Sequence, residues 1–199
     1  MKRLMDIVIA AAALVLLAPV LALVAIAILI SMGRPILFRQ MRPGHLGHPF
    51  ELVKFRSMHM ERDLPGPTVP EHHRLTRLGY FLRRASLDEL PELWNIVKGD
   101  MSLVGPRPLL MQYLPLYTAE QARRHDVKPG LTGLAQVRGR QLLDWEERFK
   151  LDVWYVDNLT IGLDLQILAS TVIQVIGGRG FRPKGALDSD FTGLTGDEP

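Results

Sequence analysis

Two adjacent carboxylates, Asp88 and Glu89, stand in a stretch of the chain that also carries arginines. Arg83 precedes the pair, and Arg107 follows it between two prolines in the run Gly105–Pro108. A carboxylate can form a phosphoryl-enzyme intermediate, and hard oxygen ligands suit Mg²⁺. Arginines hold phosphate groups and spread developing negative charge. The stretch therefore predicts an ordered site for a phosphate group and a metal ion.

The same side chains also have simpler interpretations. Acidic residues in the first turn of a helix interact favourably with the helix dipole, by about 0.3–1 kcal/mol each. Ser86 together with Glu89 matches a capping box, which would give Glu89 a purely structural role. Arg107 could equally be a loop arginine that pairs with a surface acid. The carboxylate pair alone is therefore weak support for catalysis.

Pro91 changes what is expected of the turn that holds the carboxylates. Proline has no backbone N–H to donate, so the carbonyl of Leu87, four residues earlier, lacks its usual helical donor. We hypothesise that this carbonyl oxygen faces the site and serves as a ligand to a metal ion or to water.

Two further basic stretches could supply phosphate-binding side chains. Lys54 lies in an expected strand, Phe50–Phe55, where its charge could instead point outward. Arg140 ends the turn Val137–Arg140, which is a solvated basic turn by default and a phosphate clamp if it faces the site. The six histidines show no metal-ligand spacing. The absence of cysteine excludes disulfides, thiolate catalysis and cysteine-ligated zinc.

Length and charge limit the classes of protein to consider. A chain of 199 residues is long enough for one hydrophobic core. A net charge of +3 and a pI near 9.4 suit phosphate ligands, an anionic membrane surface or, on charge alone, nucleic acid. The mean hydropathy of +0.09 is high for a soluble domain, because an apolar run lies near the N-terminus.

That apolar run extends from Ile7 to Met32 without a charged side chain. As a straight helix it would reach about 39 Å, more than the ~30 Å hydrocarbon core of a bilayer, so a single span is one interpretation. Pro19 lies near its middle and breaks or kinks a helix. Basic residues flank the run on both sides, which favours a segment that enters the membrane, breaks near Ala18-Pro19 and returns. The run alone leaves both interpretations open.

The patterns in the rest of the chain predict an α+β domain, mainly helical with short strands. We expect a membrane segment over residues 1–33, a folded domain over 34–182 and a flexible tail over 183–199. Strands are expected at 36–38 and 50–55, helices at 74–84, after Ser86, at 144–156 and at 164–176, a surface loop at 63–70 and a tight turn at 128–133.

Taken in order, these motifs are similar to those of the small monotopic phosphoglycosyl transferases, the bacterial sugar transferase family that starts glycan assembly on a polyprenyl phosphate. The similarity extends from residue 2 to about 178, over the stretches Lys2–Asp6, Phe38–Gly44, Lys54–Met58, Ser86–Leu93, Lys98–Pro108, Lys128–Gly133 and Leu151–Val156. The chain resembles the minimal catalytic form of the family, without the N-terminal transmembrane and nucleotide-sensing portion of its larger members.

The resemblance implies a two-step transfer with an aspartyl intermediate. Asp88 would attack the sugar-proximal phosphate of a UDP-sugar and release UMP, and the polyprenyl phosphate would then displace Asp88 and leave with the sugar phosphate. Mg²⁺ would neutralise the diphosphate, with Asp88 and Glu89 as its nearby carboxylates. The residues that would bind phosphate or organise the site are Arg83, Arg107, Arg140, Lys54 and Asp152.

The resemblance also implies a re-entrant membrane helix, interfacial amphipathic helices and a catalytic domain on the cytoplasmic face of the bacterial inner membrane. Its partners would be the UDP-sugar, the polyprenyl phosphate and membrane lipid, and not nucleic acid. Family members often have Ser-Pro at the membrane break, and Ala18 lacks the hydroxyl with which serine could bond a freed carbonyl. We expect the sugar to be selected by the loop around 63–70 or the loop around 138–143.

Two other functions compete with this one. A membrane-tethered basic scaffold that binds anionic lipid or nucleic acid would tolerate Asp88→Asn and fail on charge reversal of several arginines. A membrane phosphohydrolase with an aspartyl intermediate would release its product to water rather than to lipid. The transferase predicts that Asp88→Asn removes both turnover and any phosphosugar adduct.

Overall fold

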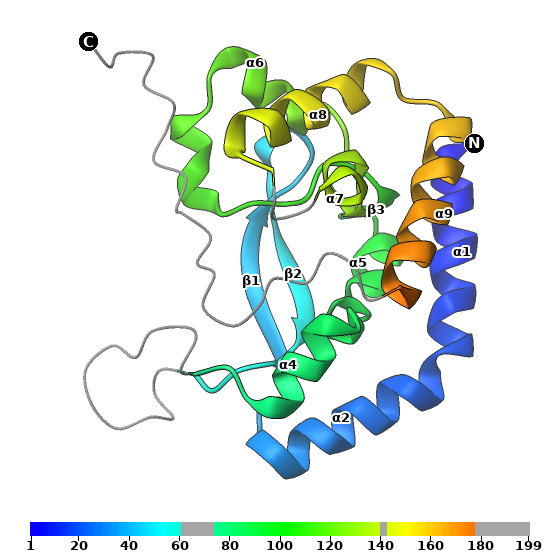
Figure 1. Ribbon diagram of the computed structural model, residues 1–199, viewed down its shortest axis with the longest axis vertical. Helices are drawn as coiled ribbons and strands as arrows, with labels where there is room; N and C mark the ends of the chain where they lie inside the picture. The colour runs from blue at the N-terminus through cyan, green and yellow to red at the C-terminus, as the bar shows by residue number, and fades with distance from the viewer. Residues whose placement is uncertain (61–73, 140–142, 178–199) are drawn as a thin grey trace.

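The structure, a computed structural model, describes residues 1–60, 74–139 and 143–177 (Figure 1). Arg140, the expected loop at 63–70 and the expected tail at 183–199 lie outside these residues, and the loop at 138–143 lies partly outside them. Helices predominate and the strands are short. This confirms the predicted mainly helical α+β class.

The structure contains the helices α1 Lys2–Leu16, α2 Ala18–Met32, α4 Arg77–Arg84, α5 Glu92–Lys98, α6 Ala119–Ala122, α7 Leu134–Arg138, α8 Trp145–Asp157 and α9 Ile161–Ile176. Its 3₁₀ turns are η1 His45–Gly47, η3 Leu87–Glu89, η4 Met111–Leu116 and η5 Arg123–His125. Its strands are β1 Leu37–Pro43, β2 Pro49–Phe55, β3 Ser102–Val104 and β4 Gly130–Thr132. The helices predicted at 74–84, 144–156 and 164–176 are confirmed as α4, α8 and α9.

The helix ends are set by local hydrogen bonds that shift them from the predicted positions. The Thr76 hydroxyl accepts from the Gly79 amide at 2.9 Å, so α4 begins at Arg77. The carboxylate of Asp144 accepts from the Glu147 amide in the same way at the start of α8. Such caps satisfy amide groups that have no partner within the first turn.

Strands β1 and β2 form an antiparallel hairpin, in which Leu37 pairs with Phe55 and Pro43 with Pro49. The hairpin was predicted, but β1 continues five residues beyond the predicted end at Phe38. This continuation carries two arginines and a glutamine and ends in a proline, which weakens the sequence signal of a strand. The hairpin forms the long central element in Figure 1.

Strands β3 and β4 form a parallel pair that begins with Ser102 opposite Gly130. The prediction of a tight turn over Lys128–Gly133 is therefore wrong for its central residues. Gly130 permits the close contact between the strands, since a Cβ atom there would lie 2.1 Å from the amide nitrogen of Gly105. A three-residue strand has no periodicity of its own, and its partner lies far away in sequence.

The apolar run folds as two helices, α1 and α2, which meet at Leu17 with a bend of 61°. Pro19 falls in the first turn of α2, where its missing N–H interrupts no helical hydrogen bond. The break predicted near Ala18-Pro19 is thus confirmed. No single helix among the described residues is long and apolar enough to cross a membrane, whereas the bent pair passes that test of length and composition when taken together.

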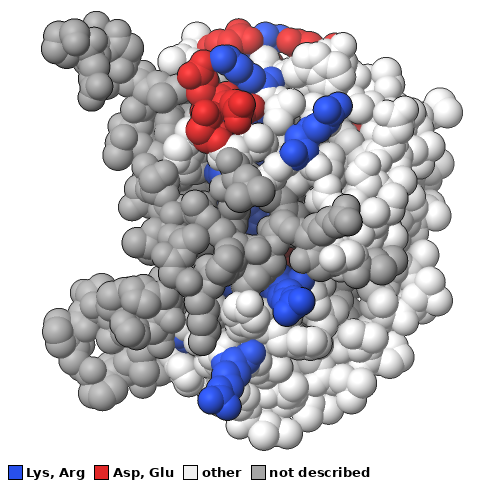
Figure 2. Space-filling view, in the orientation of Figure 1, with Lys and Arg blue, Asp and Glu red and all other residues white. Residues whose placement is uncertain are grey.

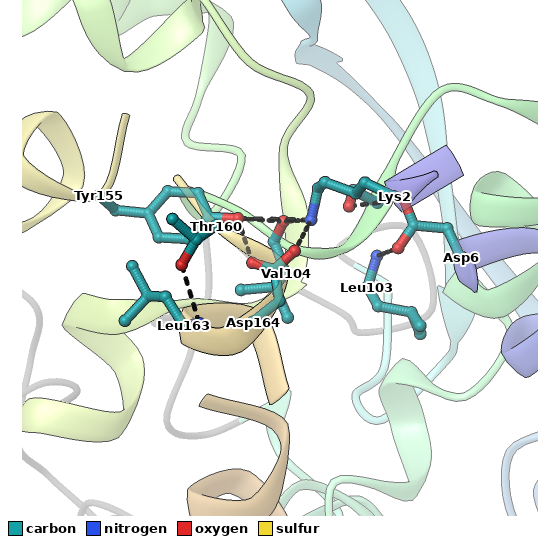
Figure 3. A network of polar contacts seen from close by, with 9 residues as sticks. Lys2, Asp6, Leu103, Val104, Tyr155, Thr160, Leu163 and Asp164 are labelled. Atoms are coloured by element: carbon teal, nitrogen blue, oxygen red, sulfur yellow. Dashed lines mark hydrogen bonds and ion pairs between the residues drawn. The ribbon is translucent and has the colours of Figure 1, made fainter. Parts of the chain in front are cut away.

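The start of α1 is tied to the folded domain by its two basic residues, of which Figure 3 shows Lys2. The ammonium group of Lys2 donates to the carboxylate of Asp164 at 2.6 Å and to the carbonyl of Val104 at 3.1 Å. The Tyr155 hydroxyl donates to the other carboxylate oxygen of Asp164 at 2.7 Å. Arg3 donates to carbonyls at the end of α5, at 2.6 and 3.0 Å. This network joins α1 to α5, β3, α8 and α9.

The end of α2 is tied to the same domain by Arg56, the residue after β2. Its guanidinium donates to the carbonyls of Met32 and Gly33 at the end of the helix. Arg56 is 2% exposed, so its charge is buried at this helix end and does not point outward. Both ends of the bent pair are therefore held by one folded unit.

The hydrophobic core has two main parts, and each includes residues of β2. One packs α1 against α5 and β3 through side chains such as Ala10, Ile96 and Leu103, and the other packs α2 against α4 through Ile28 and Leu82. The outer side of the bent pair stays exposed and apolar, and in Figure 2 the margin over α1 and α9 is white. The exposed apolar residues of the pair include Leu4, Val8, Ile9, Val15, Leu16, Leu23, Ile26, Leu29 and Ile30.

Candidate active site

The two carboxylates lie on η3, a tight turn between α4 and α5, rather than inside a helix. Ser86 adopts a left-handed conformation with φ 55° and makes no side-chain cap, so the predicted capping box is wrong. Pro91 occupies the N-cap position of α5 and makes no side-chain cap either. The carbonyl of Leu87 accepts from the Leu90 amide at 3.4 Å. The carbonyl is therefore not left without a donor, and its role as a ligand to a metal ion or to water stays a hypothesis.

The turn buries Asp88 next to several charged groups. Asp88 is only 5% exposed. Burial and the neighbouring Glu89 raise the pKa of Asp88, while the cations of Lys54, Arg83 and Arg107 oppose that rise. The charges predicted from sequence to surround this carboxylate therefore act on it in the structure. The three cations favour the anionic form, which is the nucleophilic one, but burial and Glu89 outweigh them and leave the pKa raised.

Arg107 reaches the carboxylate pair from the loop after β3. Its guanidinium donates to the carboxylate of Glu89, and this contact raises the pKa of Arg107 above its usual value. The arginine side chain is 47% exposed, so it is also open to solvent. A phosphate group can therefore reach Arg107 and compete with Glu89 for its donors.

Lys54 and Arg83 complete the basic side of the site. Lys54 projects from β2, and its ammonium group lies 5.4 Å from the centre of the Phe38 ring. Burial, followed by the charges of Arg107 and Arg83, lowers the pKa of Lys54. Arg83 comes from the last turn of α4 and donates to the Ser57 hydroxyl at 2.9 Å. Three separate elements thus present cations to Asp88.

Glu92 is a site residue that sequence reasoning missed. It opens α5, is 3% exposed, and has its pKa raised to about 8 by burial, by Glu89 and by Asp88, against the charges of Arg107 and Lys54. The spacing of the acids could have indicated Glu92, because residues four positions apart, such as Asp88 and Glu92, share one face where the chain turns helically. At neutral pH this side chain is mostly protonated and adds little negative charge beside Asp88.

Asp152, predicted as a site residue, is buried behind the arginine loop. Its carboxylate accepts from Arg124 at 2.6 and 3.1 Å, and the two side chains are 3% and 1% exposed. Arg124 also donates to the backbone carbonyl of Arg107 at 2.8 Å. Asp152 therefore acts on the site indirectly, through its ion pair with Arg124 and the hydrogen bond from Arg124 to the Arg107 backbone. Its predicted contact with substrate stays a prediction.

The structure brings together Lys54, Arg83, Asp88, Glu89 and Arg107, and it places Ala18 and Pro19 at the bend of the apolar pair. Arg140 lies outside the described residues. Within the described chain, no group of three or more acidic or histidine side chains is arranged to hold a metal ion. Mg²⁺ commonly binds one or two carboxylates together with substrate phosphates, and Asp88 with Glu89 is compatible with that pattern.

The domain is α+β, its carboxylate pair faces three cations, and a bent apolar helix pair is attached to it. The whole chain also matches known proteins. Residues 1–178 match the model of the family described as bacterial sugar transferase. The chain belongs to this family, and it is a sugar-phosphate transferase.

Similar proteins cover most or all of this chain. It is 51% identical over 195 residues to the "Uncharacterized sugar transferase EpsL" of Bacillus subtilis, a match that covers 97% of this chain and 96% of that protein. It is 44% identical over 183 residues to a UDP-glucose:undecaprenyl-phosphate glucose-1-phosphate transferase of Caulobacter vibrioides, covering 86% and 68%. The Escherichia coli protein of the same name is 40% identical over 185 residues, covering 87% of this chain but only 40% of its own length.

Proposed function

We propose that this protein transfers a sugar 1-phosphate from a UDP-sugar to a polyprenyl phosphate through a covalent intermediate on Asp88. The observation that carries the proposal is a buried carboxylate surrounded by Lys54, Arg83 and Arg107 in a chain of the sugar transferase family. The names of two similar proteins, which specify UDP-glucose and undecaprenyl phosphate, support this substrate class.

In the first step, a carboxylate oxygen of Asp88 would attack the sugar-side phosphorus of the UDP-sugar. The bond from that phosphorus to the bridging oxygen breaks, and UMP leaves with the bridging oxygen. In the second step, a phosphate oxygen of the polyprenyl phosphate attacks the same phosphorus and Asp88 departs as a carboxylate. Charge balances in both steps without a proton transfer, which suits a site that works mainly by positioning cations.

The cations of the site would bind the phosphate oxygens, where negative charge is concentrated throughout the transfer. Arg107 would exchange Glu89 for a substrate phosphate, since both groups compete for the same guanidinium. Mg²⁺, when bound to Asp88 or Glu89 and the diphosphate, would neutralise further charge. A protonated Glu92 would limit the repulsion between the substrate phosphates and the acidic turn.

We further infer that α1 and α2 form a re-entrant element and that the domain lies on the cytoplasmic face of the inner membrane. Lys2 and Arg3 tie the first end of the pair to the domain, and Arg56 ties the second end to the same domain. A spanning helix would place its ends on opposite sides of the bilayer. The exposed apolar side chains on the outer side of the bend support insertion into lipid.

The intact mass of the protein tests the proposed chemistry. After incubation with a panel of UDP-sugars, one of them should add the mass of one sugar phosphate, and polyprenyl phosphate should then discharge the adduct. Asp88→Asn should abolish the adduct, whereas Asp126→Asn, an exposed acid elsewhere, should leave it unchanged. Discharge of the adduct by water alone would favour a phosphohydrolase, and normal lipid loading by Asp88→Asn would contradict the proposal.

A further inference from the structure

An open pocket of about 430 Å³ lies inside the bend between α1 and α2 and is lined on its other side by the hairpin and α5. We call it the elbow groove. Leu14 and Leu21, which stand on either side of the bend, form its apolar wall with Val53 and Phe55 of β2. Its volume falls within the range of small-molecule pockets in proteins.

The elbow groove is separate from the active site. Side chains alternate between the two faces of a strand, so Val53 on the groove side and Lys54 on the site side point in opposite directions. On α5, Trp94 and Lys98 line the groove, whereas Glu92 interacts with the charges of the site. The hairpin and α5 therefore form a wall with different chemistry on each side.

The polar residues of the groove place positive charge beside its apolar wall. Arg39 donates to Glu51 at 2.8 Å, and Lys98 lies 3.1 Å from the carboxylate of Asp100. The Arg39 and Lys98 side chains are 60% and 55% exposed, so both can turn toward a new anionic partner. Of the charged residues that line the groove, two are basic and Glu51 is acidic.

An aromatic residue marks the boundary between the apolar and charged parts of the groove. Trp94 is 57% exposed and lines the groove one helical turn before Lys98. Tryptophan together with basic side chains is typical of the level at which lipid headgroups meet hydrocarbon. The neighbouring bend carries exposed apolar residues such as Leu16 and Leu23. An occupant of the groove would therefore meet hydrocarbon at one end and cations at the other.

We propose that the elbow groove binds an anionic glycerophospholipid, with its headgroup phosphate at Arg39 and Lys98 and part of an acyl chain along Leu14 and Leu21. The complementary charge favours an anionic headgroup over a zwitterionic one. A bound lipid would fill the space between the bent pair and the hairpin and so brace the bend. The inference depends on the proposed membrane insertion of α1 and α2, and it is independent of the proposed transfer reaction.

Trp94 is a built-in reporter of this site. The variant Trp145→Phe with Trp154→Phe retains only this tryptophan. In phosphatidylcholine nanodiscs, a small fraction of brominated phosphatidylglycerol should quench its fluorescence more than random contact with lipid would. The same fraction of brominated phosphatidylcholine should quench it far less. Arg39→Ala with Lys98→Ala should weaken the phosphatidylglycerol effect roughly tenfold or more. Arg123→Ala with Lys150→Ala removes two other ion-paired surface cations and should change nothing.

A second measurement avoids the tryptophan substitutions. Native mass spectrometry of the unmodified protein should detect retained phosphatidylglycerol, and less of it in the Arg39→Ala/Lys98→Ala variant. Equal quenching by both brominated lipids, or retention unchanged in that variant, would overturn the proposal. Loss of the quenching on addition of polyprenyl phosphate would assign the groove to the carrier lipid instead. Failure of the protein to float with vesicles would refute membrane insertion, and formation of the phosphosugar adduct would still report separately on the reaction.

Discussion

The guanidinium of Arg124 donates to the backbone carbonyl of Arg107 at 2.8 Å while it is paired with Asp152. Arg124 also lies over the rings of Tyr117 and Phe149, at 5.8 and 5.6 Å from their centres. Arg107 stands in a loop between two prolines, which limit the backbone of the loop. The buried Arg124–Asp152 pair therefore fixes the backbone of the loop, while the Glu89 carboxylate accepts a hydrogen bond from the Arg107 side chain.

Breaking this buried pair should destabilise the fold. Asp152→Asn would leave the Arg124 charge without an anionic partner in a place that is closed to water, which typically costs roughly 3–5 kcal/mol. Denaturant unfolding should show this loss in the free energy of unfolding. The matched control is Glu120→Gln, which removes a partner of the exposed Arg123 and should have no measurable effect. Equal stability of the two variants would mean that the pair adds nothing to the fold.

The pair should also affect the reaction through Arg107. If Arg107 binds the substrate phosphates, Arg107→Lys should lower kcat by about 10²–10³, because a single ammonium group replaces a planar guanidinium. Arg124→Lys keeps the charge beside Asp152 but loses the planar guanidinium, which bonds Asp152 through two nitrogens and lies over the rings of Tyr117 and Phe149. The Arg107 carbonyl should then be held less firmly, so kcat/KM should fall in a protein that remains folded.

A double-mutant cycle separates positioning from a general structural effect. In Arg107→Lys, the loop no longer presents the guanidinium that Arg124 positions, so adding Arg124→Lys should lower kcat/KM little further. Effects that simply multiply would show that Arg124 acts independently of Arg107.

The part of the site that could be predicted from sequence is the part carried by short motifs. Asp88 and Glu89 are neighbours in the chain, and Arg83 lies one turn earlier, so any compact local fold keeps them together. Arg107 follows in the loop after β3, and the prolines on either side of it indicated a restricted backbone. Lys54 comes from the hairpin, and only the resemblance to the sugar transferases connected it with the carboxylates.

The parts that could not be predicted depend on contacts between residues distant in sequence. Arg124 and Asp152 are 28 residues apart, and nothing in either local pattern indicates a buried ion pair. The β3–β4 pair joins two three-residue segments at glycines, which local patterns interpret as turns. Glu92 looks like an ordinary acid in the first turn of a helix, and only its burial beside Glu89 changes its chemistry.

The raised pKa of Glu92 predicts a dependence of stability on pH. Its pKa is about 8 in the folded protein against 4.5 for an ordinary glutamate, so the folded state holds a proton that the unfolded state releases between these values. The stabilisation is fully present below about pH 4.5 and is lost as the pH rises through about 8. The total change should be on the order of a few kcal/mol.

Glu92→Gln removes this titration and keeps the shape of the side chain. Its free energy of unfolding relative to the unmodified protein should therefore rise steadily from pH 5 to pH 8, as measured by denaturant unfolding at each pH. Glu146→Gln, an exposed acid on α8, serves as the control and should show no such trend. A constant difference between Glu92→Gln and the unmodified protein would mean that Glu92 is ionised throughout this range.

The last prediction concerns the topology of the bent pair. The chain contains no native cysteine, so single introduced thiols can be labelled without background. A cysteine added before Met1 and Lys150→Cys should both resist a membrane-impermeant maleimide in intact cells and both react in inverted vesicles. Leu16→Cys, 78% exposed at the bend, should be protected in both preparations because lipid covers it. Labelling of the N-terminal cysteine from outside intact cells would show that the pair spans the bilayer and does not return.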